Sequence, residues 1–227
     1  TVNAGEKLTL PACTFTPPEG KVFDKWEAGN PGEQVEVTAD SVIRAIWKEK
    51  SAETPIKPFT DVKDTDYFYN AVLWAYYHDP QITKGTSDTT FEPETTVLRG
   101  QAVTFLWRVA GCPTPTGEGE KFSDVDYSDS SWYGQAVQWA VEQKITNGTG
   151  EGKFSPWDKL YQDQMITLIW RTLGEPGEKG TGSTWYADSE NWARSHKLMD
   201  GTGKAYNHGD DCPRADVVYY LFKELAR

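Results

Sequence analysis

The feature that most constrains the fold is an internal repeat. Gly85 and Gly148 lie 63 residues apart, and the same spacing relates the Phe-x-Pro segments that begin at Phe91 and Phe154. A shorter, more divergent copy follows, in which Gly201 stands 53 residues after Gly148. One such unit cannot bury its own apolar face, whereas adjacent units bury theirs against one another. The sequence therefore predicts similar units packed together.

Each copy predicts a short helix, a glycine turn and a longer helix. Short helices are expected over 70–77 and 134–143, and the apolar spacing predicts a long helix over 97–110. In the third copy, Asp211 and Pro213 are expected to cap the long helix. The copies are expected to occupy 58–111, 121–174 and 183–227. Three long helices, each apolar over a wide arc, predict a mainly α fold in which these helices pack together.

The first 48 residues have a different pattern. Alternating apolar residues, bounded by Pro and Gly clusters, predict a small β domain over 1–48 with strands near 7–10, 22–26, 34–37 and 42–47. The segment from Ala4 to Pro11, with Phe23 and Trp26, resembles the Listeria–Bacteroides surface repeat. That resemblance implies a β-grasp-like domain lacking its first strand. Residues 49–57 are expected to be a linker.

Composition and motifs exclude several functions. A net charge of −11 argues against a nucleic-acid partner, and no apolar run is long enough for membrane insertion. No catalytic motif is present and the three histidines occur singly, so we expect no enzyme activity and no cofactor. The acidic clusters at 61–66 and 124–129 lack EF-hand spacing, which predicts a solvated acidic face and no metal site.

The motif order of the copies resembles the S-layer homology (SLH) repeat. In the first copy, Phe-Thr-Asp-Val at 59–62 precedes Ala-Val-Leu-Trp-Ala at 71–75, Ile-Thr-Lys-Gly at 82–85 and Leu-Trp-Arg at 106–108. The resemblance implies a monomeric pseudo-trimer, a pseudo-threefold spindle around a central three-helix bundle. It also implies an extracellular, non-catalytic part of a longer surface protein. Such a module binds the secondary cell-wall polysaccharide, often pyruvylated, of Gram-positive-type bacteria.

The family's Thr-Arg-Ala-Glu motif opens the long helix. The matching tetrapeptides here begin at Leu98, Tyr161 and Pro213, and the second of them lacks arginine. Arg99 and Arg214 would therefore bind a carboxylate through a bidentate guanidinium, helped by free N–H groups of the first helical turn. The loss of arginine in the second copy puts the second groove in doubt as an anion site.

The expected glycan site joins these helix starts to glycine turns and exposed aromatic rings. Its residues are Lys84, Gly85, Thr86, Arg99, Gln101, Trp132, Tyr133, Asn147, Gly148, Gln162, Gln164, Trp185, Tyr186, Asp200, Gly201, Arg214 and Asp216. Two alternatives remain open at this point. The arginines could pair with surface acids and the glycines could only end helices, or the chain could be a protein-binding or surface-assembly module whose glycan grooves are degenerate.

Overall fold

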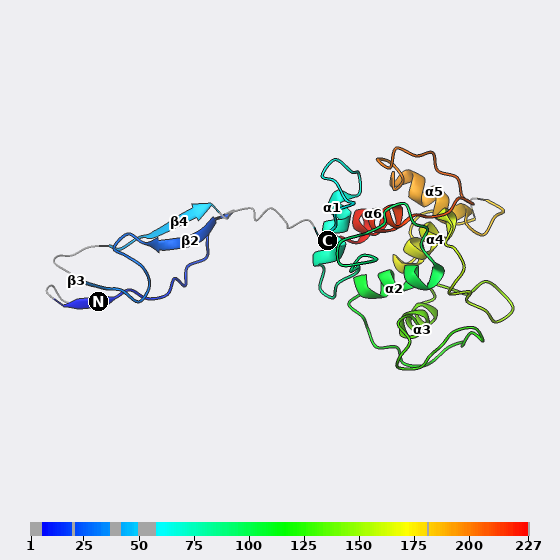
Figure 1. Ribbon diagram of the computed structural model, residues 1–227, viewed down its shortest axis with the longest axis horizontal. Helices are drawn as coiled ribbons and strands as arrows, with labels where there is room; N and C mark the ends of the chain where they lie inside the picture. Colours follow the sequence, from blue (N-terminus) through cyan, green and yellow to red (C-terminus); the bar gives the residue numbers. More distant parts are fainter. Residues whose placement is uncertain (1–5, 20, 37–41, 50–57, 181, 227) are drawn as a thin grey trace. The chain divides into compact units, whose positions relative to one another are not determined.

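The computed structural model describes residues 6–19, 21–36, 42–180 except 50–57, and 182–226. The chain divides into two compact units, residues 1–56 and residues 57–227 (Figure 1). The expected linker at 49–57 lies outside the described residues except for Glu49. The repeat boundaries stay predictions.

The N-terminal unit contains four short strands: β1 (Lys7–Thr9), β2 (Lys21–Trp26), β3 (Gln34–Glu36) and β4 (Ala45–Glu49). β1 pairs antiparallel with β3, and β2 pairs antiparallel with β4. Leu10 and Trp26 are buried, and the Trp26 indole donates a hydrogen bond of 2.7 Å to the Pro11 carbonyl. The expected residues Val37 and 1–5 lie outside the described residues, and the resemblance to the surface repeat stays a prediction.

The second unit contains six helices among its described residues. They are α1 (Tyr69–Tyr77), α2 (Arg99–Val109), α3 (Gly134–Glu142), α4 (Gln162–Thr172), α5 (Ala187–Ser195) and α6 (Arg214–Leu225). Each copy thus contributes a short helix and then a longer one, as the repeat predicts. The described part of the chain is mainly helical with a small strand portion.

The helices of different copies interlock. The long helices α2, α4 and α6 contact one another (Figure 1). Each short helix packs against the long helix of another copy: α1 on α6, α3 on α2 and α5 on α4. Buried side chains from all three copies form one hydrophobic cluster, which includes Val72, Leu106, Ile166 and Leu221. No copy therefore has a core of its own.

The glycine turns require a residue without a side chain. Gly85 and Gly148 have φ values of 82° and 76°, in the left-handed region. A Cβ on Gly148 would lie 2.3 Å from the Lys153 carbonyl oxygen and 2.5 Å from the Phe122 ring. Gly85 meets the equivalent Phe59 ring at 2.4 Å. The turns therefore fold tightly over the phenylalanine that opens each of the first two copies.

Two sequence interpretations need correction. α6 begins with Pro213 as its N-cap and no side-chain cap, and the Asp211 carboxylate instead accepts hydrogen bonds from Thr96 and Lys159. The spacing of the copies is also not uniform. The residues before α1 and α3, Phe68 and Tyr133, lie 65 residues apart, so the segment ahead of α3 is two residues longer. This alignment makes Tyr67 the counterpart of Trp132.

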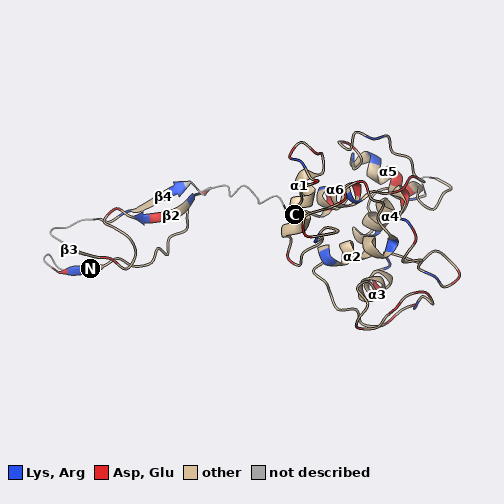
Figure 2. Ribbon diagram, in the orientation of Figure 1, with Lys and Arg blue, Asp and Glu red and all other residues tan. Residues whose placement is uncertain are grey.

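Charged residues of both signs are interspersed over the loops and helix ends of the helical unit (Figure 2). Within the described residues, no helix combines the length and apolar character needed to cross a membrane.

Candidate binding grooves

The starts of the three long helices lie against loops from other copies. Arg99, Gln162 and Arg214 are the first residues of α2, α4 and α6. Their backbone N–H groups donate to carbonyl oxygens 2.9–3.0 Å away, on Asp158, Asp210 and Thr95 respectively. The next N–H group of each helix also donates to a neighbouring loop. These N–H groups are not free for an anion, which corrects one part of the sequence argument and leaves the side chains to provide recognition.

The Arg214 groove combines residues from all three copies in a volume of about 240 Å³. Its lining residues are Thr83, Lys84, Gly85, Gln101, Thr104, Phe105, Arg108, Trp132 and Arg214. Arg214 is 4% exposed, and its Nε donates 2.8 Å to the Phe91 carbonyl. One Nη donates 3.2 Å to the Thr83 hydroxyl, and the guanidinium lies 4.9 Å from the centre of the Phe91 ring.

The Arg99 groove has the same construction and a volume of about 350 Å³. Its lining residues are Arg99, Thr146, Asn147, Gly148, Thr149, Gln164, Thr167, Leu168, Arg171 and Trp185. Arg99 is 7% exposed, donates from Nε to the Phe154 carbonyl at 2.9 Å, and lies 4.9 Å from the centre of the Phe154 ring. In both grooves, arginine, glycine turn and tryptophan come from three different copies.

Both arginines retain a charge that no nearby carboxylate neutralises directly. Burial lowers the pKa of Arg99 and of Arg214, while more distant carboxylates such as Asp158 and Glu92 raise it. Across the described residues, no ion pair within 4.0 Å involves either guanidinium. Because an arginine side chain stays protonated in proteins, each groove has a buried cation in its wall. The alternative of pairing with surface acids does not describe these residues.

The Phe-x-Asp-Val motif holds the arginine's partner loop in place. The Asp124 carboxylate accepts hydrogen bonds from the N–H groups of Phe154 and Ser155, at 2.9 and 2.8 Å. Asp61 accepts the equivalent bonds from Phe91 and Glu92. The carbonyls of Phe154 and Phe91 then accept from the arginines. Asp61 and Asp124 are therefore bonded structural groups, which corrects the expectation that they only form a solvated acidic face.

The Gln162 groove differs in its chemistry. Its lining residues, in a volume of about 240 Å³, are Glu94, Thr96, Gln162, Met199, Thr202, Lys204, Ala205, Tyr206, Asp210, Asp211, Pro213, Asp216 and Tyr220. The Gln162 amide donates to Asp216 at 2.7 Å and accepts from the Tyr220 hydroxyl at 3.0 Å. The Tyr67 hydroxyl also donates to Asp216. The polar groups of this groove thus satisfy one another, and four carboxylates face one lysine.

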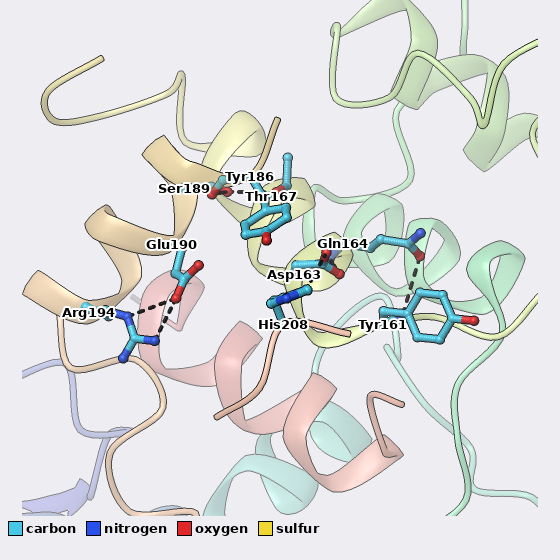
Figure 3. A network of polar contacts seen from close by, with 9 residues as sticks. All are labelled: Tyr161, Asp163, Gln164, Thr167, Tyr186, Ser189, Glu190, Arg194 and His208. Carbon is cyan, nitrogen blue, oxygen red and sulfur yellow. Dashed lines mark hydrogen bonds and ion pairs between the residues drawn. The ribbon is translucent and has the colours of Figure 1, made fainter. Parts of the chain in front are cut away.

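An acidic residue also follows Gln162 at the start of α4 (Figure 3). Asp163 is buried, and burial raises its pKa. Its carboxylate accepts the Gln164 N–H at 2.8 Å and lies 3.9 Å from Nδ1 of His208. The His208 ring stacks on Tyr186, with 4.8 Å between ring centres. The corresponding positions in α2 and α6 are Gly100 and Ala215, so this helix start alone among the three carries a buried acid.

The predicted aromatic residues separate into two groups. Trp132 and Trp185 are 44% and 59% exposed and line the Arg214 and Arg99 grooves. Tyr133 is only 6% exposed and belongs to the hydrophobic core. Tyr186 is half-buried under His208. The tryptophans can contact a ligand in the grooves, whereas the adjacent tyrosines are structural.

The grooves collect most of the predicted site residues and add others. Thr86, Asp200 and Gly201 are outside the groove linings; the Thr86 hydroxyl bonds to Thr90 within its own turn. The lining residues that sequence reasoning missed are Thr83, Thr104, Arg108, Thr146, Thr149, Thr167 and Arg171. Arg108 and Arg171 each donate to a carbonyl that precedes the glycine turn. Their 63-residue spacing was the available signal for these two.

The pairing of grooves with copies also needs correction. Gln162 belongs to the second copy, yet it lines the groove formed with Met199 and Thr202 of the third. The turn of the second copy, at Asn147 and Gly148, faces Arg99 of the first. The groove without arginine is therefore the one at the third copy's turn.

Comparison with known proteins identifies the first two copies. Residues 58–103 and 121–166 match the S-layer homology domain. The third copy and the N-terminal unit lie outside the matched segments, so their assignments stay predictions.

Several curated proteins are similar to this chain. A cell surface protein of Thermoanaerobacter kivui is 32% identical over 119 residues, which cover 52% of this chain and 15% of that protein. An amylopullulanase of Thermoanaerobacterium thermosulfurigenes is 30% identical over 145 residues, 61% of this chain and 7% of the enzyme. A cellulosome-anchoring protein of Acetivibrio thermocellus is 26% identical over 142 residues, 59% of this chain and 32% of that protein. The chain therefore spans less than a third of each of these relatives.

Proposed function

We propose that the helical unit, with two segments that match the S-layer homology domain, is a non-catalytic module that anchors a longer surface protein to the bacterial cell wall. Its ligand is an anionic secondary cell-wall polysaccharide with a carboxylate, such as a pyruvate ketal, on a sugar ring. The Arg99 and Arg214 grooves are its binding sites. The matched segments, and the cell-surface and anchoring relatives, support this function at the level of the module.

The observation that carries the proposal is the repeated meeting of three groups. A buried guanidinium, a glycine turn and an exposed tryptophan line each of two grooves, and each group comes from a different copy. A guanidinium in a partly desolvated wall binds a carboxylate through charge-assisted hydrogen bonds. The tryptophan provides a flat apolar face for a sugar ring. The three copies act together as one pseudo-threefold module, because no copy supplies a complete groove.

Local chemistry dominates this binding. The chain has a net charge of −11, so long-range electrostatics repel an anionic glycan. The attraction comes from a buried cation at short range, which salt screens less than it screens exposed charges. We expect binding to weaken only modestly as the salt concentration rises.

The test is co-sedimentation with purified cell walls. The double variant Arg99→Gln/Arg214→Gln places in both grooves the residue that α4 carries at the equivalent position. Thermal melting shows whether the variant is folded. The proposal predicts that the wild-type protein sediments with walls and the folded double variant stays in the supernatant. Equal sedimentation of both proteins would remove the arginines from the site.

Wall chemistry separates the proposal from a protein-binding function. Chemical removal of pyruvate, or of the whole secondary polysaccharide, should release the wild-type protein. Retention on walls stripped of the polysaccharide would favour a protein-binding or surface-assembly module. The acidic, self-satisfied Gln162 groove is the feature that such a module would share.

A further inference from the structure

Trp157 is an exposed aromatic residue that the grooves do not include. Its side chain is 61% exposed, the highest value among the large hydrophobic residues described in the helical unit. Its ring centre lies 6.0 Å from that of Trp132, with the ring planes at 69°, and 5.7 Å from that of Tyr133. Trp132 lines the Arg214 groove. The two indoles therefore form an angled aromatic corner that continues from this groove onto the surface.

The fold itself does not require a tryptophan at position 157. The carbonyl of the preceding residue, Pro156, accepts from the second N–H of α2. Pro93 and His208 have the same role toward α6 and α4. The residues that follow them, Glu94 and Gly209, are the counterparts of Trp157. Because the equivalent positions hold a glutamate and a glycine, the indole at 157 serves something other than packing.

Position 157 is also held in place. Tyr133, which is 6% exposed, contacts the Trp157 ring edge-on from below, and Trp132 contacts it from the side. An indole that stays exposed against two rings is an ordered platform for an apolar ring face. Its ligand must also be compatible with the groove beside it.

We propose that Trp157 and Trp132 form a second sugar subsite, which binds the ring adjacent to the acid-bearing sugar in the Arg214 groove. This inference rests on the proposed glycan function and extends it. The ligand is an uncharged pyranose of the same chain, which stacks its apolar C–H face on the indole. The Arg99 groove has Gly209 at the corresponding position and lacks this subsite. The Arg214 groove therefore discriminates by chain length, and the Arg99 groove does not.

The experiment compares one-ring and two-ring ligands in single-groove proteins. Acid-bearing monosaccharide and disaccharide fragments are prepared by partial hydrolysis of purified wall polysaccharide, and their affinities are measured by titration calorimetry. Arg99→Gln leaves the Arg214 groove as the binding site. In this background the disaccharide should bind about three- to tenfold more tightly than the monosaccharide, in line with the strength of aromatic contacts. Adding Trp157→Gly should abolish the advantage without changing monosaccharide affinity.

A gain-of-function variant provides the matched control. A Cβ on Gly209 would meet nothing within 4 Å, so Gly209→Trp introduces an indole into open space. In an Arg214→Gln background, this substitution should create a disaccharide preference in the Arg99 groove. An unchanged preference in the Trp157→Gly protein would overturn the subsite while leaving the glycan function intact. Failure of the wild-type protein to bind either fragment would overturn both proposals.

Discussion

The starts of α2 and α6 differ from the start of α4 although all three have the same position in the fold. α2 and α6 begin with arginine followed by a small residue, Gly100 or Ala215, and their side chains face a groove with an open cationic wall. α4 begins with Gln162 and the buried Asp163. The Gln162 amide is already bonded to Asp216 and Tyr220. One backbone position can therefore hold a ligand-binding charge or a closed internal network.

The difference also separates a structural role from a binding role. Asp216 occupies the third position of α6, where α2 and α4 carry Gln101 and Gln164. Each glutamine accepts the N–H of its own helix N-cap residue. Asp216 instead accepts from Tyr67 and Gln162, across the boundary between copies. In this groove, polar groups stabilise the assembly of the copies, and few are left to contact a ligand.

The largest expected effect comes from converting the Gln162 groove into an arginine groove. Gln162→Arg together with Asp216→Gln reproduces the pair present at the other two sites. We expect the double variant to gain one binding site for an acid-bearing sugar, measured by titration calorimetry. Gln162→Arg alone should gain none, because Asp216 would neutralise the new guanidinium at close range. A gain of binding in the single variant would show that the carboxylate is not what closes this groove.

Substitutions in the glycine turns should separate the grooves by stability. Gly148→Ala places a Cβ 2.3 Å from a backbone carbonyl at a φ of 76°, and the left-handed conformation alone costs about 1–2 kcal/mol. In Gly201→Ala the first contact is the tip of the Tyr219 side chain, which can move. Denaturant unfolding should show a larger loss for Gly148→Ala. Equal losses would mean that the turns have the same constraint.

Removal of the carboxylate that holds the Phe154 loop should destabilise the chain and weaken the Arg99 groove. Asp124→Ala leaves two backbone N–H groups without their acceptor, at a cost of about 1.5–3 kcal/mol. The third copy has no Phe-x-Asp-Val motif and provides no equivalent to compare. Asp126→Ala, at an exposed site two residues away, is the control and should change stability little. Chemical denaturation of the two variants tests this.

The smallest effect is a pH dependence at the start of α4. Burial raises the pKa of Asp163 above its value in the unfolded chain, so the folded state binds the proton more readily. Folding stability of the wild type relative to Asp163→Asn should therefore rise as the pH falls through the folded-state pKa. Melting temperatures of both proteins, measured from neutral to acidic pH, should converge toward low pH. A difference that stays constant over this range would exclude titration of Asp163 as its cause.

Much of the helical unit follows from the sequence because its signals are repeated. The apolar faces fix the long helices, and the glycine turns occur where a side chain would meet Phe59 or Phe122. The arginines were predicted to face the turn of the next copy, and Arg99 does so. Repetition makes such pairings visible without an alignment.

Other features depend on contacts that pattern alone does not specify. Trp132 and Tyr133 are adjacent aromatic residues, yet one lines a groove and the other is buried, because the chain enters α3 between them. The bonds of Asp61 and Asp124 join residues about thirty positions apart. The spacing of 65 residues between Phe68 and Tyr133, against 63 elsewhere, concealed Tyr67 as a counterpart of Trp132. These features arise from tertiary packing.

The most direct test of the central claim is the number of acid-bearing sugars that one chain binds. Titration calorimetry with the acid-bearing monosaccharide should give two sites in the wild type, one in Arg99→Gln and one in Arg214→Gln. Gln162→Ala should retain both sites. Three sites in the wild type, or an unchanged number in either arginine variant, would contradict the assignment of binding to the two buried guanidiniums.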